Sequence, residues 1–199
     1  MPQSLCKTYI HLIFHVKTTS PKIQDDDIDR IHSYIGQLVN ETGCIDIQVG
    51  GVADHVHILF ILSKDVALSY VVEEIKRNSS RWIKSISPKY HMFAWQGGYG
   101  AFSVSQSVVS KTLEYIKGQR EHHKRVSFAD EYKAFLISYN IEYDERYVFK
   151  DKNAFALSGR RGIQTLYPGR CPGLGAGWAF SPHYFIICTK CLEWAKTCS

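Results

Sequence analysis

The sequence predicts an α+β domain with a ferredoxin-like (RRM-like) antiparallel sheet, helices on one face of that sheet, and a further helix after it. Four short segments alternate in polarity with a period of two, as half-buried strands do, and two longer segments repeat apolar residues at helical spacing. Their order is β-α-β-β-α-β, which is the order of a split βαβ pattern.

The first strand and helix follow from patterning at the start of the chain. Residues 7–17 alternate between two faces. The acids of Asp25–Asp27 supply the N-cap and first turn of a helix, and Gly43 ends it. The apolar stripe of this helix is Ile28, Ile31, Ile35, Leu38 and Val39.

The remaining sheet elements follow in the same way. Residues 44–50 alternate, Gly50-Gly51 is expected to turn the chain, and residues 52–63 form the third strand. A fourth strand is expected over residues 99–104, after a loop. The helix between these two strands has one stripe: Leu68, Val71, Val72, Ile75, Ser79, Trp82 and Ile83.

Two helices are expected after the sheet. The first starts at a cap on Ser105 or Ser107 and runs to about residue 123, with Val108, Val109, Thr112, Leu113 and Ile116 as its stripe. The second spans residues 128–138 and buries Tyr132, Phe135 and Leu136.

The composition changes near Lys150. We expect residues 1–150 to form one domain and residues 151–199 to be an irregular Gly- and Cys-rich extension of unknown function. Only two of the six cysteines fall in the first 150 residues, whereas a secreted disulfide scaffold would spread them through the core, so reduced thiols are the preferred interpretation. The tail holds one Cys-x-x-Cys pair, and a zinc ribbon needs a second close pair, so a zinc site there is the weaker interpretation.

Composition and charge limit the class of protein. No apolar run approaches the roughly 18 residues of a membrane helix, and the first residues do not resemble a signal peptide, so we expect a cytoplasmic protein without membrane association. Residues 1–150 carry 18 Lys and Arg against 17 Asp and Glu, so net charge alone does not indicate a nucleic-acid partner. Basic clusters on two helices are candidate DNA contacts, with solvated helix faces as the alternative. The candidates are Lys76, Arg77, Arg81, Lys84, Lys111, Lys117 and Arg120.

Two short motifs contain the residue types of a metal-dependent phosphoryl-transfer site. His55 and His57 are two apart on the third strand, so their imidazoles share one face. Tyr115 and Gln119 are four apart on the third helix and share one side of it. Two imidazoles need a third ligand to hold a metal, and the neutral carbonyl of Gln119 would leave the full +2 charge on the ion. A tyrosine hydroxyl is also able to act as a covalent nucleophile.

Each of these residues has a purely structural alternative. Tyr115 fits a core position on spacing alone. His55 and His57 could lie on an edge strand without binding any ligand, as we expect for His11 and His15.

Three polar residues next to the motifs have weaker assignments. Strand alternation makes Asp54 face away from the paired histidines, which argues against a direct ligand role. His122 or His123 could approach the metal or a phosphate, but the preferred interpretation is that both are solvated.

The paired-histidine strand, the segment GYGAFSVSQS and the helix containing YIKGQ resemble, in order and spacing, the single-tyrosine transposases of the HUH endonuclease superfamily. These include insertion-sequence transposases and those associated with repeated extragenic palindromes (REP). The segments SLCKTYIHLIFHVKTTSPKI, GGVADHVHILF and EHHKRVSFADEYKAFL are similar to the same group, and the resemblance covers about residues 3–149.

This resemblance implies that His55, His57 and Gln119 hold Mg²⁺ or Mn²⁺ and that Tyr115 is the nucleophile. It further implies a homodimer that recognises a DNA hairpin and that cleaves and rejoins single-stranded DNA through a 5′-phosphotyrosine. It also implies a bacterial or archaeal protein that is associated with the nucleoid when bound to DNA.

Two other functions remain open at this point. One is a domesticated, non-mobile regulator that binds hairpin DNA on the same fold. The other is a metal hydrolase of the histidine-triad kind, although that family requires a third alternating histidine where this chain has Leu59.

Overall fold

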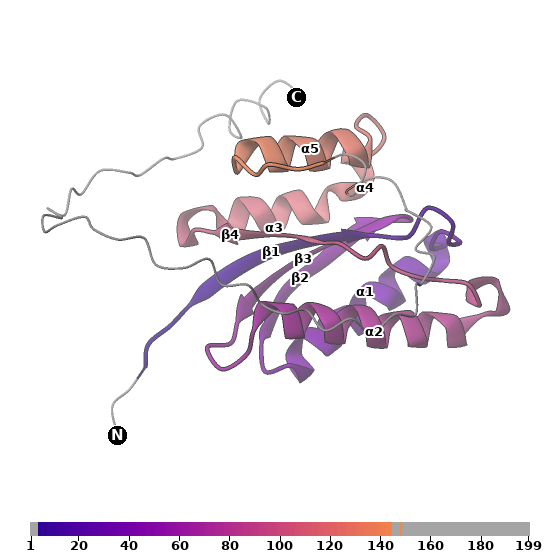
Figure 1. Cartoon of the computed structure of the whole chain (residues 1–199), viewed down its shortest axis with the longest axis horizontal. Coiled ribbons are helices and arrows are strands. Elements are labelled where there is room, and N and C mark those ends of the chain that lie inside the picture. Colours follow the sequence, from indigo (N-terminus) through magenta and orange to yellow (C-terminus); the bar gives the residue numbers. More distant parts are fainter. Residues whose placement is uncertain (1–3, 145–147, 149–199) are drawn as a thin grey trace, which may run out of the picture. The chain divides into compact units, whose positions relative to one another are not determined.

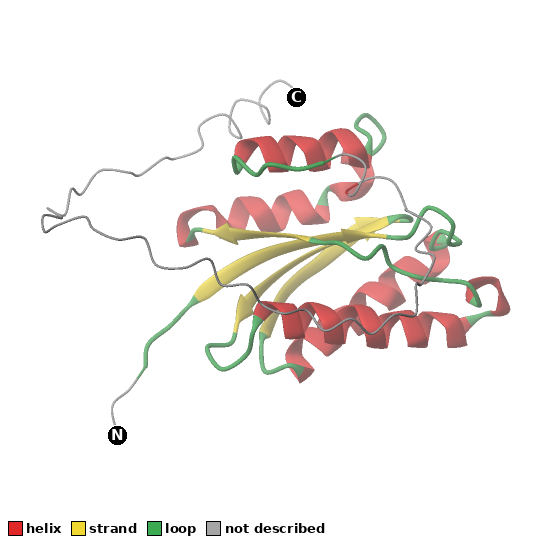
Figure 2. Cartoon of the chain, in the orientation of Figure 1, coloured by secondary structure: helices red, strands yellow, loops and turns green. Residues whose placement is uncertain are grey.

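A computed structural model of the chain describes residues 4–144 and 148 (Figure 1, Figure 2). The chain divides into two units, Met1–Lys152 and Asn153–Ser199. The predicted extension of residues 151–199, with its cysteines, lies outside the described residues. The elements in chain order are β1 (Thr8–His15), α1 (Asp25–Glu41), β2 (Ile45–Val52), β3 (His55–Leu62), α2 (Leu68–Ile86), the 3-10 turn η1 (Pro88–Tyr90), β4 (Gly100–Val104), the 3-10 turn η2 (Gln106–Val108), α3 (Val109–Lys117), α4 (Gln119–His122) and α5 (Phe128–Ser138).

The four strands form one antiparallel sheet in the order β2-β3-β1-β4. The ferredoxin-like fold class predicted from the segment order is therefore confirmed. β1 and β3 are the inner strands and pair along their whole length, with His15 opposite His55 and Ile13 opposite His57. Because β1 is an inner strand, the expectation that His11 and His15 lie on a sheet edge is wrong.

Helices cover both faces of this sheet. Figure 1 shows α1 and α2 on one face and α3, α4 and α5 on the other. On the face of α1 and α2, alternate residues of the inner strands belong to the main apolar cluster: Ile10, Leu12, Phe14, Val56, Ile58 and Phe60. On the opposite face the same strands present His11, His55 and His57, all of them buried. The helices that follow the sheet therefore cover three buried imidazoles that lie among apolar residues such as Ile13 and Leu59.

The two long helices α1 and α2 each bury one stripe, as the helical spacing predicts. The buried residues of α1 include all five of the predicted stripe, and those of α2 are Val71, Val72, Ile75, Ser79 and Ile83. None of the helices in the described part of the chain has the length and apolarity that crossing a membrane requires.

The turn between β2 and β3 comes later in the chain than predicted. Ala53 and Asp54 form it, whereas Gly50 and Gly51 belong to β2. Glycine occurs at position 50 because α3 lies close to β2 there. A Cβ atom on Gly50 would lie 2.5 Å from the backbone oxygen of Ile116. Gly50 is therefore needed where α3 crosses β2, not for a turn.

The predicted helix up to about residue 123 is two helices. α3 ends before Gly118, whose backbone (φ −80°, ψ 3°) departs from α-helical values, and α4 begins directly after it. Neither predicted serine cap forms, since the hydroxyls of Ser105 and Ser107 lie 2.8 Å from each other and neither caps the start of α3. α5 occupies the range predicted for the last helix.

Candidate active site

β3 presents two imidazoles to the face that α3, α4 and α5 cover. His55 and His57 are completely buried, with ring centroids 5.1 Å apart. In each ring Nδ1 contacts a neighbour: His55 Nδ1 lies 2.8 Å from Asp54 Oδ1, and His57 Nδ1 lies 2.9 Å from His11 Nε2. Such outer contacts fix the orientation and tautomer of a ligating ring, so both Nε2 atoms are available to the cluster.

The sequence assigns neither of these outer partners. Asp54 lies in the β2–β3 turn rather than on the strand, so strand alternation does not apply to it and its carboxylate reaches His55. His11 is 3% exposed, and its ring stacks on that of His57 at 5.2 Å between centroids. A search for polar residues at the same-face positions of both inner strands would have found His11.

Tyr115 and Gln119 approach the imidazoles from α3 and α4. The ring centroids of Tyr115 and His57 are 5.9 Å apart. Gln119 is 1% exposed, and its Oε1 lies 3.3 Å from His55 Nε2 and 2.9 Å from His123 Nε2. The four residues singled out in the sequence thus lie together within one chain.

Two further residues of this cluster come from the segment after Gln119. Glu131 is 2% exposed; its Oε1 accepts hydrogen bonds from the Tyr115 hydroxyl and, at 3.1 Å, from the Gln119 amide. Its Oε2 lies 3.2 Å from His123 Nε2, 3.5 Å from His57 Nε2 and 3.9 Å from His55 Nε2. The interpretation of His122 and His123 as solvated is wrong, because their side chains are only 18% and 10% exposed, and His122 Nε2 lies 3.5 Å from Glu131 Oε1.

The packing of α5 explains why Glu131 points into the cluster. Tyr132 and Leu136 are buried against Ile13 and Phe102 of the sheet. The Ser127 side chain caps the helix by accepting from the backbone of its first turn. These contacts fix the orientation of α5, so Glu131, the residue before Tyr132, faces β3 and its carboxylate lies among the histidines.

The cluster is able to hold a divalent metal ion. One ligand atom from each of His55, His57, His123 and Glu131 lies within 4.8 Å of all the others. His57 Nε2 and Glu131 Oε2 are buried, have no hydrogen-bond partner and face each other. Ligand atoms about 2.1 Å from a common ion lie roughly 3.0–3.5 Å apart. The distances from Glu131 Oε2 to His123 and His57 are of this size.

Burial shifts the pKa values of the cluster toward the uncharged forms. It raises the pKa of the Glu131 carboxyl to about 8 and lowers that of His123 to about 4. Burial, reinforced by neighbouring histidines, also holds the pKa of His57 well below its usual range. Neutral imidazole is the form that binds a metal, so His57 and His123 are in their ligating form at neutral pH.

The candidate DNA-binding residues separate into two groups. Lys76 of α2 donates to the backbone oxygens of residues 96–98, and Arg77 pairs with two glutamates of its own helix. These residues, with Arg81 and Lys84, belong to the helix on the far face of the sheet from the histidines. The other three candidates, Lys111 and Lys117 of α3 and Arg120 of α4, are exposed on the helices that cover the histidines.

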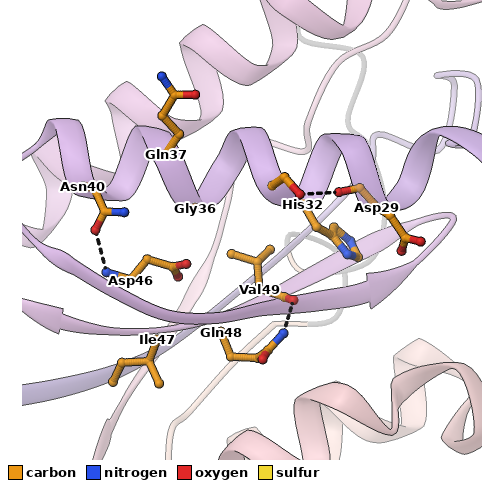
Figure 3. Close-up of a pocket in the computed structure, with 10 residues that line it drawn as sticks. Asp29, His32, Gly36, Gln37, Asn40, Asp46, Ile47, Gln48 and Val49 are labelled. Atoms are coloured by element: carbon orange, nitrogen blue, oxygen red, sulfur yellow. Dashed lines mark hydrogen bonds between the residues drawn. The ribbon is translucent and has the colours of Figure 1, made fainter.

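One groove in the described part of the chain lies apart from the histidine cluster. It measures about 630 Å³ and runs between α1 and the edge strand β2, where Asp29, His32, Asn40 and Asp46 lie along it (Figure 3). A smaller groove of about 180 Å³ shares Asp29 and His32 and is also lined by Lys117 and Arg120. Arg120 is paired there with Asp29 at 3.1 Å.

Comparison with known proteins gives one family match. The family model described as "Transposase IS200 like" matches residues 4–119, which is more than half of the chain. Two solved structures are similar in fold. One is a "putative transposase" from Deinococcus radiodurans R1, with 20% identity, coverage of 60% of this chain and 98% of that chain, and a TM-score of 0.47. The other is a REP-associated tyrosine transposase bound to a REP hairpin, with 12% identity, coverage of 63% and 74%, and a TM-score of 0.47. No curated protein matches the chain.

Proposed function

This chain belongs to the IS200-like transposase family, whose members are DNA-cleaving enzymes, and we propose that it cleaves and rejoins single-stranded DNA through a covalent link between Tyr115 and a 5′-phosphate. The observation that supports this proposal is the shared cluster of Tyr115 and Gln119 with His55 and His57. The histidine-triad alternative has no comparable support, since Leu59 is packed in an apolar cluster.

We assign His55, His57 and Gln119 as residues that hold a divalent ion, Mg²⁺ or Mn²⁺. A divalent ion at this place supplies positive charge that polarises the scissile phosphate and offsets the negative charge developing on it. The outer contacts of His55 with Asp54 and of His57 with His11 keep both rings turned toward the ion.

Tyr115 is assigned as the nucleophile. Its hydroxyl donates to Glu131, which fixes the direction of the phenolic oxygen. In the proposed reaction this oxygen gives up its proton and forms a bond to phosphorus, while the bond from phosphorus to the 3′-oxygen breaks; the 3′-oxygen takes up a proton and leaves as a free 3′-hydroxyl. Attack by a second 3′-hydroxyl on the phosphotyrosine reverses the step and rejoins DNA, so no external energy source is needed.

For the nucleic acid we propose a single strand next to a hairpin, bound by a homodimer. Lys111, Lys117 and Arg120 are exposed on α3 and α4, the helices that also carry Tyr115 and Gln119, and are the preferred phosphate contacts. The basic residues of α2 lie on the opposite face of the sheet, so we assign them no contact at the cleaved phosphate. The cytoplasmic localisation stays a prediction of the sequence.

One observation favours a non-cleaving regulator as the second candidate. The side chains of His55, His57, Gln119 and Glu131 are at most 2% exposed, because α4 and α5 cover them. Cleavage therefore requires the phosphate to enter by displacing part of this cover, whereas binding of a hairpin elsewhere on the surface does not.

Incubation with hairpin-bearing single-stranded DNA from the flanks of the gene, in the presence of Mn²⁺, tests the proposal. We expect a protein–DNA adduct that survives denaturing electrophoresis, and no adduct from Tyr115→Phe. A native chain that retards the hairpin but never forms the adduct would support the regulator instead. An adduct that persists in Tyr115→Phe would refute the assigned nucleophile.

A further inference from the structure

Two side chains of the histidine cluster lie beyond the segment that matches the transposase family. The match ends at residue 119, whereas His123 follows α4 and Glu131 lies on α5. The family match therefore includes neither residue. Both are nevertheless enclosed in the cluster, with His123 10% and Glu131 2% exposed.

The contacts of Glu131 Oε2 indicate a missing partner. This oxygen is buried without a hydrogen-bond partner, and so is His57 Nε2, 3.5 Å away. Leaving two buried polar atoms unpaired is unfavourable, because each has lost its hydrogen bonds to water and gained none from the protein. An ion between them would satisfy both, since a metal accepts electron pairs from a neutral imidazole nitrogen and from a carboxylate oxygen alike.

The donor set indicates the kind of ion. Three imidazoles (His55, His57 and His123) surround one carboxylate oxygen at 3.9, 3.5 and 3.2 Å. Mg²⁺ prefers oxygen ligands and retains several waters, whereas imidazole suits first-row transition metals. A site with mainly nitrogen donors thus favours Mn²⁺ and its neighbours over Mg²⁺.

We propose that His123 and Glu131 are metal ligands, and that together with His55 and His57 they make a site that prefers a transition-metal ion such as Mn²⁺ to Mg²⁺. This inference deepens the proposed function and rests on it for the role of the ion in cleavage. Binding of an ion would displace the proton of Glu131, and the resulting carboxylate would reduce the charge of the site from the full +2 expected for a neutral ligand set.

Glu131 also connects the ion to the nucleophile. One oxygen faces the imidazoles, and the other accepts the Tyr115 hydroxyl and the Gln119 amide. Gln119 is therefore in a position to orient Glu131, in addition to offering its own carbonyl oxygen. Because Glu131 contacts both the imidazoles and the Tyr115 hydroxyl, its side chain aligns the phenol with the metal site.

The test is a titration of the metal-stripped full chain with MnCl₂, followed by electron paramagnetic resonance and repeated with excess MgCl₂. We expect the native chain to bind Mn²⁺ and to retain it against Mg²⁺. Glu131→Gln keeps the shape and the hydrogen bond to Tyr115 but loses the charge, and it should weaken Mn²⁺ binding at least about tenfold, as should His123→Asn. Glu121→Gln removes an exposed carboxylate from α4 and is the matched control, with Mn²⁺ affinity within about twofold of the native chain.

The opposite results would overturn the inference. If Glu131→Gln and His123→Asn both bind Mn²⁺ like the native chain, and Glu131→Gln forms the DNA adduct as fast or faster, the carboxylate covers the site instead of ligating. Displacement of Mn²⁺ by equal Mg²⁺ would contradict the proposed preference. Tyr115→Phe separates this inference from the proposed function, because it should abolish the adduct while the chain still binds Mn²⁺ in preference to Mg²⁺. Melting curves of the metal-free variants show whether each one is folded.

Discussion

The two faces of the sheet use the same strands for different purposes. On the face covered by α1 and α2, β3 presents Val56, Ile58 and Phe60, which are at most 1% exposed and entirely apolar. On the other face it presents the apolar Leu59 but also His55 and His57, equally buried and beside the polar side chains of His123 and Glu131. Because strand side chains alternate, eight residues supply both a core and a site. The apolar face provides stability, and the polar face keeps buried polar atoms that a well-packed core would exclude.

Removal of the His57 imidazole is expected to have the largest effect of these changes. It should lower adduct formation and leave the fold intact. His57→Ala deletes a ligand of the proposed ion and should lower adduct formation by more than about a thousandfold, or roughly 4 kcal/mol of transition-state stabilisation. The fold should survive, since the apolar face is untouched. Adduct yield against time on a denaturing gel measures the first effect and urea unfolding the second.

His15→Ala is the matched control for that variant. His15 is also on the polar face, but its ring nitrogens contact backbone oxygens of Val16 and Val148 and no member of the cluster. Its loss should change adduct formation less than about threefold. Equal losses in the two variants would mean that the histidines of this face act only through packing.

The apolar face should give the reverse result. Phe60→Ala truncates a side chain that is 0% exposed, and should reduce the free energy of unfolding by about 3 kcal/mol. At temperatures where the variant remains folded, the adduct should still form. Urea unfolding followed by circular dichroism gives the stability. A Phe60→Ala protein that is stable but inactive would show that the two faces are not separable in this way.

Gly50→Ala tests how the polar face is held together. The new methyl group would lie 2.5 Å from the Ile116 backbone oxygen and 2.7 Å from its Cγ2, so α3 must move away from β2. We expect a loss of about 2 kcal/mol in stability together with a fall in adduct formation, since Tyr115 moves with α3. Gly97→Ala, where the added atom meets nothing within 4 Å, should be nearly neutral in both measurements.

The smallest effect expected is the loss of stability in acid that comes from the titration of His32. His32 lines the groove of Figure 3, and burial lowers its pKa from 6.5 to about 4. Below pH 6.5 the unfolded chain binds this proton and the folded chain does not, so stability is complete above that pH and decreases as the pH falls toward 4. His32→Gln should remove roughly 1 kcal/mol of the decrease between about pH 7 and pH 5.5 in urea unfolding. An unchanged pH dependence would mean that His32 titrates normally in the folded chain.

The sequence predicted the parts of the molecule that depend on periodicity. Alternation located the four strands, helical spacing located α1 and α2, and their order predicted the sheet. His55 and His57 were found because strand alternation alone places both rings on one face. The glycine pair misled the prediction, since a glycine required by the close approach of α3 looks the same in sequence as one required by a turn.

The other members of the cluster, Glu131 and His123, take their places through tertiary packing, which local sequence patterns do not indicate. Glu131 looks like a solvent-facing acid on a short helix, and only the docking of Tyr132 and Leu136 on the sheet turns it inward. His123 enters the cluster because the chain after Gly118 starts a new helix, and the backbone break is not evident from apolar spacing. The proposed ligand set therefore differs from the one that the two motifs suggest.

The most direct test of the account is to digest the protein–DNA adduct formed with Mn²⁺ and to locate the bound nucleotide by tandem mass spectrometry. The account predicts a 5′-phosphate on the peptide that contains Tyr115, and on no peptide from another tyrosine. A nucleotide on any other residue, or a cleaved strand with no nucleotide on the protein, would contradict it.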